Sequence, residues 1–181
     1  MGHPERPARL TAICDHLQSV GLWDSLQHLE PSPAARETLA LVHPPSYIDL
    51  IERACHDGPV ALDPDTVASR GSWDAARYAV GALTEAIDQV CRGQLEGAFC
   101  AVRPPGHHAL AERAMGFCLF NNVAIGARYA QQHHGVERIL IVDWDVHHGN
   151  GTQAIFEDDI SVFYFSTHQF PFYPGTGSAR E

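Results

Sequence analysis

The sequence predicts an α/β fold built on a parallel sheet with helices on both faces. In the second half of the chain, short apolar runs alternate with helical stretches, an order typical of right-handed βαβ units. These apolar runs, at 97–102, 139–146 and 160–166, show no regular alternation of apolar and polar residues. Such runs are expected of strands covered on both faces by helices.

The first half of the chain is predicted to be mainly helical. Apolar residues at helical spacing predict a helix over 10–20, and a second, shorter helix follows Pro45 and ends at Gly58. The polar stretch 63–71 is expected to be a loop. Ser72 is then a candidate N-cap for a long, alanine-rich helix that reaches about Cys91.

The second half supplies the predicted sheet. The run 97–102 is too short for a helix and is expected to be a strand, and 123–132 is expected to be a helix that ends at Gly135. The β-branched run 139–146 predicts the second strand. A short helix over 150–157 and a strand over 160–166 complete the alternation.

Composition limits the class of protein. The 181 residues carry a formal net charge of −10, which argues against direct nucleic-acid binding. Hydrophobic residues make up 45% of the chain, enough to expect a packed core, and no apolar run is long enough to span a membrane. The five cysteines form no Cys-x-x-Cys pair, and the N-terminus resembles no signal peptide, so a cytoplasmic location is expected.

Chemically active residues gather where the predicted strands end. Ligands of parallel sheets bind beyond the carboxyl ends of the strands, which directs attention to the loops 103–109, 143–151 and 166–177. Asp143, Asp145 and His147 alternate, so an extended backbone would place them on one face. Two neighbouring carboxylates favour a bound cation, and carboxylate and imidazole groups suit Zn²⁺. The alternative is structural: Asp145 caps a helix and His147 fills a gap.

A rigid histidine pair follows the first predicted strand. Pro104 and Pro105 stiffen the turn, and Gly106 permits a close approach of the backbone. His107 and His108 could then divide the roles of base and of acid or electrostatic partner. The alternative is that both imidazoles are merely solvated.

Two aromatic segments give weaker signals. Phe117 and Cys118 could line an apolar channel or belong to the core. Residues 169–177, here called the aromatic loop, place rings among Pro and Gly, as the wall of an apolar tunnel requires. The pair at 133–134 ends a helix and is given no function.

Taken in order, the motifs RPPGHHA, GFCLFNNVAIGA, VDWDVHHGNGTQ and FYPGTG resemble the zinc-dependent histone deacetylase superfamily, as does the opening HPERPARL. Asn150 resembles the class II branch and the bacterial histone-deacetylase-like amidohydrolases. The resemblance implies an arginase/deacetylase-like fold and zinc-dependent hydrolysis of acyl-amide bonds. The implied substrates are an acetylated lysine side chain or a small acetylated amine.

The resemblance also implies roles for individual residues. Asp145 and His147 match two of the family's three zinc ligands. The catalytic positions form two pairs. His107 matches the histidine that pairs with a buried acid, here Asp143, and His108 matches the general base, which pairs with Asn150. Because an amide adds no charge, His108 is expected to be neutral at pH 7. The residues that match the walls of the substrate channel are Gly116, Phe117 and Tyr173.

Monovalent cations are implied as well. The family's structural potassium matches backbone and side-chain groups of Asp143, Asp145, His147, Ser166 and Thr167. A second monovalent site matches Phe156, Asp159 and Val162.

The family pattern is incomplete in this sequence. The third zinc ligand and the transition-state tyrosine of the family lie downstream of FYPGTG, and no acid after His147 stands in a matching motif. We therefore expect 1–181 to be the N-terminal portion of a single deacetylase domain, with a sheet that is incomplete on its C-terminal side. The alternative is a non-catalytic, truncated member that acts only as an interaction module. The oligomeric state is left open.

Overall fold

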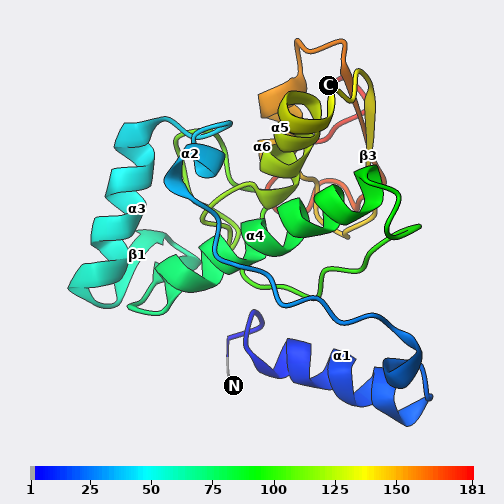
Figure 1. Ribbon diagram of the computed structural model, residues 1–181. Helices are drawn as coiled ribbons and strands as arrows, with labels where there is room; N and C mark the ends of the chain where they lie inside the picture. Colours follow the sequence, from blue (N-terminus) through cyan, green and yellow to red (C-terminus); the bar gives the residue numbers. More distant parts are fainter. Residues whose placement is uncertain (1–2) are drawn as a thin grey trace.

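Six α-helices, one 3₁₀ turn and two small sheets make up residues 3–181, the part of the chain that the computed structural model describes (Figure 1). In chain order the elements are α1 (Ala8–Ser19), η1 (Trp23–Ser25), α2 (Arg36–Leu39), α3 (Pro45–Asp57), β1 (Val60–Asp63), β2 (Thr66–Ala68), α4 (Ser72–Cys91), α5 (Asn122–His134), β3 (Ile139–Asp143), α6 (Asn150–Phe156) and β4 (Val162–Ser166). None of these helices is both long and apolar enough to cross a membrane.

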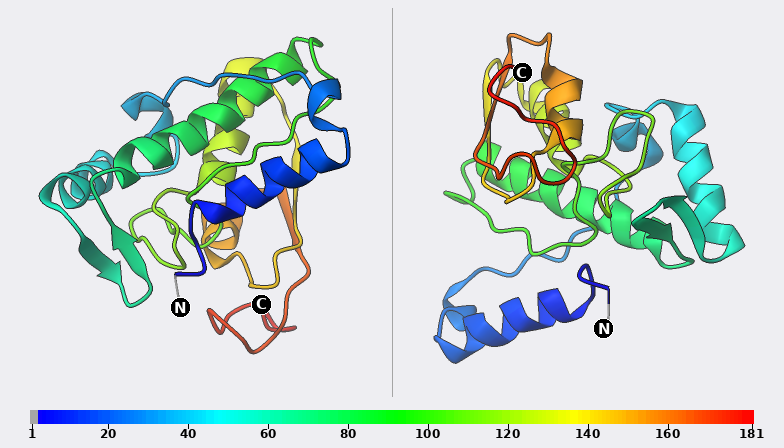
Figure 2. Two further views of the ribbon diagram at one scale, coloured as in Figure 1. Left: turned by 90° about the horizontal axis from the view of Figure 1, so that it is seen from below. Right: turned by 180° about the vertical axis from the view of Figure 1, so that it is seen from behind.

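The long helix α4 crosses the middle of the molecule and joins its two parts. α3 and the β1–β2 hairpin lie at one end of α4, and α5, α6 and β3 gather at the other (Figure 1). α1 forms as predicted but is set apart from the other helices in Figure 1 and in the right-hand view of Figure 2, and none of its residues is buried. Its apolar side, formed by Leu10, Ile13, Cys14 and Leu17, is therefore only partly covered within residues 3–181.

Two apolar clusters form the core. The larger one joins α3, α4 and the segment before α5, with Ile48, Ile51, Val80 and Phe120 all nearly inaccessible. The smaller cluster packs the α5 residues Ala124 and Ala127, together with Phe156 of α6, against the sheet of β3 and β4.

The sheet that bears on function is the parallel pair β3–β4. Its register runs from Ile139 opposite Val162 to Asp143 opposite Ser166, and α6 connects the two strands, as the βαβ pattern predicts. Ile141 and Val162 point into the smaller core cluster. The other face is exposed in residues 3–181; its apolar side chains are Leu140 (62%), Val142 (46%), Phe163 (67%) and Phe165 (48%).

Several local predictions were wrong. The expected loop 63–71 contains β2, which pairs antiparallel with β1; strands of three and four residues are too short to show a periodicity. The run 97–102 forms no strand, because no segment within 3–181 pairs with it. β3 ends at Asp143 rather than at 146. Gly71, not Ser72, is the N-cap of α4, while the Ser72 hydroxyl accepts the N–H of Ser69 at 3.0 Å.

Candidate active site at the carboxyl ends of the parallel strands

The three loops singled out in the sequence meet beside the ends of β3 and β4. The backbone N–H of Gly151 donates to the carbonyl of His107 at 3.0 Å, which ties the start of α6 to the histidine loop. The N–H of Thr167 donates to the carbonyl of Asp143 at 3.0 Å, and that of Gln169 donates to Val146 at 2.9 Å. The site is therefore held by backbone bonds between loops that are distant in sequence.

Each of the two adjacent histidines has a different partner. Nδ1 of His107 lies 2.9 Å from Oδ2 of Asp143, and Nδ1 of His108 lies 2.9 Å from Oδ1 of Asn150. The two rings are 4.0 Å apart between centroids. Since an amide oxygen can only accept, Nδ1 of His108 carries the hydrogen and its Nε2 is free to accept one.

The environment keeps His108 uncharged. His108 is only 4% exposed. This burial, and to a smaller extent the neighbouring His107, lowers the pKa of His108 from 6.5 to about 4. The direction agrees with the neutral state expected from the amide partner. At pH 7 the free Nε2 is therefore available as a proton acceptor.

Asp143 is the most heavily bonded acid of the site. Besides His107, it accepts the hydroxyl of Tyr164 at 3.0 Å and the backbone N–H of Asp145 at 3.2 Å. Burial alone would raise the pKa of this carboxyl group. The hydrogen bonds and the adjacent imidazole outweigh burial and hold the pKa of Asp143 below its ordinary value.

Asp145 and His147 lie in the loop beyond β3, and their zinc-type donor atoms converge. Oδ1 of Asp145 and Nδ1 of His147 are 3.1 Å apart, and both side chains are about half exposed (49% and 44%). Nε2 of His107 lies 4.0 Å from the same carboxylate oxygen. Within residues 3–181, no group of three His, Cys, Asp or Glu side chains is arranged to hold a metal. The donors present fit two positions of a tetrahedral zinc site.

The residues matched to monovalent cations fall into two places. Ser166 stands opposite Asp143 in the sheet register, and Thr167 bonds to the Asp143 backbone, so this first set surrounds the end of β3. At the second place, the N–H of Asp159 donates to the carbonyl of Phe156 at 2.9 Å. The Asp159 carboxylate pairs with Arg128 at 2.5 Å, so a guanidinium group already supplies a positive charge there.

Glycine is required at position 116, where the backbone contacts the ring of His108. Gly116 has a φ of +57°, and a Cβ on it would lie 2.3 Å from Cδ2 of His108. The next residue, Phe117, also has a positive φ, +68°. Its N–H donates to Oγ1 of Thr66 at 2.9 Å, and that of Gly116 donates to Asp65 at 3.2 Å. The β1–β2 hairpin thus holds this strained turn.

The two aromatic residues matched to the channel occupy different surroundings. The Tyr173 ring stands perpendicular to His108, with centroids 5.0 Å apart, and 5.9 Å from His147. Burial and the nearby carboxylates of Asp65 and Asp63 raise the pKa of the Tyr173 phenol. Phe117 instead packs edge-on against His3. Cys118, the other candidate in that segment, is fully buried and belongs to the core.

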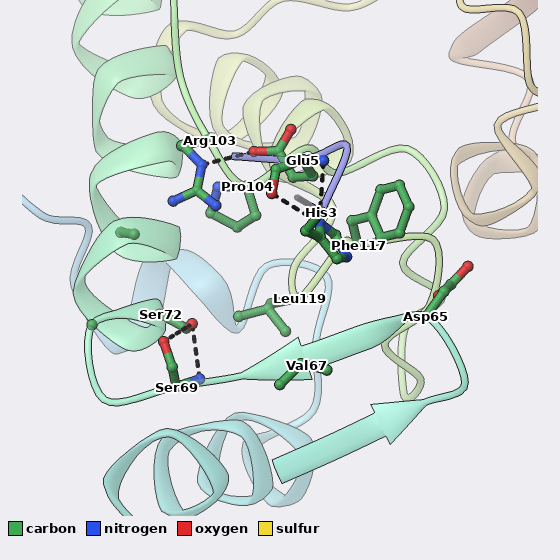
Figure 3. A pocket seen from close by; sticks show the side chains of 12 residues that line it. His3, Glu5, Asp65, Val67, Ser69, Ser72, Arg103, Pro104, Phe117 and Leu119 are labelled. Carbon is green, nitrogen blue, oxygen red and sulfur yellow. Dashed lines mark hydrogen bonds and ion pairs between the residues drawn. The ribbon is translucent and has the colours of Figure 1, made fainter. Parts of the chain in front are cut away.

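Phe117 also borders a cavity of about 360 Å³ on the outer side of this turn (Figure 3). Figure 3 shows Arg103 beside Glu5, whose carboxylate accepts the Arg103 Nε–H at 2.8 Å. Asp65 lines the same cavity and at the same time supports the Gly116 turn. Asp65 was not predicted from the sequence; the Pro64-Asp65 step, a turn-forming dipeptide, signals the turn but not its contact with Gly116.

Known proteins resemble this chain over nearly its whole length. Residues 3–181 match the histone deacetylase domain family. An uncharacterised protein of Synechocystis sp. is 47% identical over 99% of the chain and 60% of its own length. The polyamine deacetylase HDAC10 of Homo sapiens is 46% identical (92% of the chain, 26% of the relative), and the histone deacetylase-like amidohydrolase of Pseudomonas aeruginosa is 40% identical (99% and 48%).

Solved structures agree with the sequence comparison. The crystal structure of the HDA15 HD domain superposes with a TM-score of 0.94 at 41% identity, over 98% of this chain and 53% of that one. This match confirms the predicted fold class. The chain spans between about a quarter and three fifths of the relatives named here, and about half of the superposed domain.

Proposed function

This chain belongs to the histone deacetylase family, and we propose from this that residues 1–181 form the N-terminal portion of a single deacetylase domain that hydrolyses acyl-amide bonds. The observation that carries the proposal is the pair of adjacent histidines with unlike partners, an acid for His107 and an amide for His108, beside two converging zinc-type donors. Acyl-amide hydrolysis needs a proton acceptor, a group that stabilises negative charge and an electrophile at one place.

His108 is proposed as the general base. Its Nδ1–H is bonded to Asn150, so Nε2 faces the site with a lone pair and can take the proton of the attacking water. Its lowered pKa ensures that it does not begin the reaction already protonated. Asn150, the first residue of α6, fixes the ring orientation without adding charge.

His107 and Asp143 are proposed as the electrostatic partner. The carboxylate of Asp143 stabilises a positive charge on His107, which faces the oxyanion that forms from the amide carbonyl and can protonate the leaving amine. A Zn²⁺ held by Asp145, His147 and further donors from the rest of the domain would polarise that carbonyl and acidify the attacking water. Structural K⁺ is proposed at the end of β3, with Ser166 and Thr167 among its ligands.

The proposed substrate is a neutral acyl-amine stem. Tyr173 and Phe117 offer apolar ring surface near the histidines, and Gly116 leaves room beside His108. An acetylated lysine side chain and a small acetylated amine both fit this chemistry, and the relatives' names include a polyamine deacetylase and a histone deacetylase. Five unpaired cysteines are consistent with a cytoplasmic protein.

The test joins 1–181 to the remaining domain of the Synechocystis relative and loads the chimera with zinc. Hydrolysis of an acetyl-lysine peptide and of an acetylated diamine is then measured. His108→Ala is expected to lower kcat by about 10²- to 10⁴-fold, whereas His133→Ala on the distant end of α5 serves as a matched control. A folded, zinc-loaded chimera without activity, or a His108→Ala variant as active as the control, would favour the non-catalytic interaction module.

A further inference from the structure

A second pair of histidines lies beside the proposed active site and takes no part in its chemistry. The rings of His148 and His168 are 4.6 Å apart between centroids, and His148 is only 2% exposed. His148 follows the site residue His147 directly, and His168 immediately precedes the aromatic loop 169–177. The pair therefore stands between the loop 143–151, here called the strand-end loop, and the aromatic loop, which carries Tyr173.

Every ring nitrogen of this pair has a hydrogen-bond partner. Nε2 of His148 donates to the amide oxygen of Gln153 at 2.7 Å, which leaves Nδ1 to accept the hydroxyl of Thr176 at 2.8 Å. Nε2 of His168 donates to the carbonyl of Gly177 at 2.8 Å, and its Nδ1 accepts the hydroxyl of Ser166 at 2.8 Å. These bonds connect α6 and β4 to the far end of the aromatic loop.

Gly177 closes the arrangement. Its φ is +82°, and a Cβ there would lie 2.2 Å from Nε2 of His168 and 2.7 Å from Cγ of His148. The backbone can approach the two imidazoles this closely only because the residue has no side chain. At the other end, the N–H of Gln169 is bonded to Val146 at 2.9 Å, so the aromatic loop is held at both ends.

We propose that His148 and His168 are positioning residues: they fasten the aromatic loop to the strand-end loop and thereby hold the Tyr173 ring perpendicular to His108 and His147. The consequence for catalysis rests on the proposed function. Because neither imidazole faces the reacting atoms, loosening this connection should impair the binding of the acyl-amine stem more than the chemical step. In kinetic terms, KM should rise while kcat changes little.

Thr176 is the position at which to test this, since Thr176→Val removes one hydroxyl at nearly constant shape. The primary measurement is amide hydrogen exchange across 169–177 in the 1–181 chain. Loss of the bond to His148 should accelerate exchange in this loop by about 5- to 10-fold, and Thr176→Ser should restore the wild-type rate. Thr84→Val on α4, where the hydroxyl donates to the Gly81 carbonyl at 3.1 Å, is the matched control.

Kinetics of the zinc-loaded chimera supply the second measurement. Thr176→Val should raise KM by about 5- to 10-fold with kcat essentially unchanged, and Thr84→Val should change neither constant. Exchange that stays at the wild-type rate, or a loss confined to kcat, would overturn the proposal. An inactive wild-type chimera would count against the proposed function alone, because the exchange measurement still decides whether His148 and Thr176 hold the loop.

Discussion

His43 makes the stability of the fold sensitive to acid. The residue is fully buried before α3; its Nδ1–H donates to the carbonyl of Ala111 at 2.8 Å, and its Nε2 accepts the N–H of Asn121 at 2.9 Å. Burial, only partly offset by the bond to Ala111, lowers the pKa of His43 to about 4. A second ring proton would point at the N–H of Asn121, so the folded chain resists protonation at this site.

The sign and size of the effect follow from the two pKa values. In the unfolded chain His43 titrates near 6.5, so below that pH the unfolded state takes up a proton that the folded state excludes. Protonation of His43 therefore leaves the free energy of unfolding unaffected above about pH 6.5 and lowers it progressively as the pH falls toward 4. At about 1.36 kcal/mol per pH unit, the whole loss is about 3 kcal/mol, of which about 2 kcal/mol is reached by pH 5.

Urea unfolding at pH 7.5 and pH 5 measures this loss, at a protein concentration where sedimentation shows a monomer. His43→Gln keeps an acceptor for Asn121 but cannot titrate. At pH 7.5 this variant should be less stable than the wild type, because the Ala111 carbonyl loses its donor. Between pH 7.5 and pH 5, its free energy of unfolding should fall by about 2 kcal/mol less than that of the wild type. His56→Gln, at an exposed position of α3, should follow the wild type. An equal loss of unfolding free energy on acidification in the wild type and in His43→Gln would refute the idea that His43 causes the acid sensitivity.

Three further predictions concern the site and the sheet. Asn150→Asp places a carboxylate beside His108 and should raise its pKa, which moves the acidic limb of kcat/KM to higher pH; a limb that stays in place would contradict the assignment of the base. Asp145 and His147 are only two donors, so the 1–181 chain should bind Zn²⁺ weakly, and elemental analysis that found stoichiometric zinc after chelation would disprove this. The exposed apolar face of β3 and β4 should make the 1–181 chain self-associate, and Phe163→Lys on this face should raise the monomer fraction in sedimentation velocity; a wild-type chain that stays monomeric, or association unchanged by Phe163→Lys, would contradict this.

Elements with a strong local signal could be predicted from the sequence. α4 and α5 combine apolar spacing with clear ends, and the βαβ alternation identified the parallel pair β3–β4. The β1–β2 hairpin escaped prediction because its strands are too short for a pattern and depend on each other. The run 97–102 has the composition of a strand, yet strand formation needs a pairing neighbour, which residues 3–181 do not provide.

Residues of the site were predictable where a motif holds them together in sequence. His107 and His108 could be found because they are adjacent and follow a stiff turn. Their pairing with Asp143 and Asn150 was expected from the family resemblance and not from local spacing, and the structure shows both contacts. Asp65 supports the Gly116 turn from a hairpin far away in the chain, and no spacing rule connects the two. Long-range contacts of this kind depend on topology, which local patterns do not encode.

The larger core cluster also has a consequence for synthesis on the ribosome. The imidazole of His43 accepts the N–H of Asn121, which is synthesised 78 positions later. The hydroxyl of Tyr47 donates to the carbonyl of Leu119, which is synthesised 72 positions later. At about 5–20 residues per second, α3 spends roughly 4–15 s outside the ribosome before its partners emerge. Its apolar side is then a target for nascent-chain chaperones. Crosslinking to chains stalled before 121 emerges, but not to longer ones, would detect this interval.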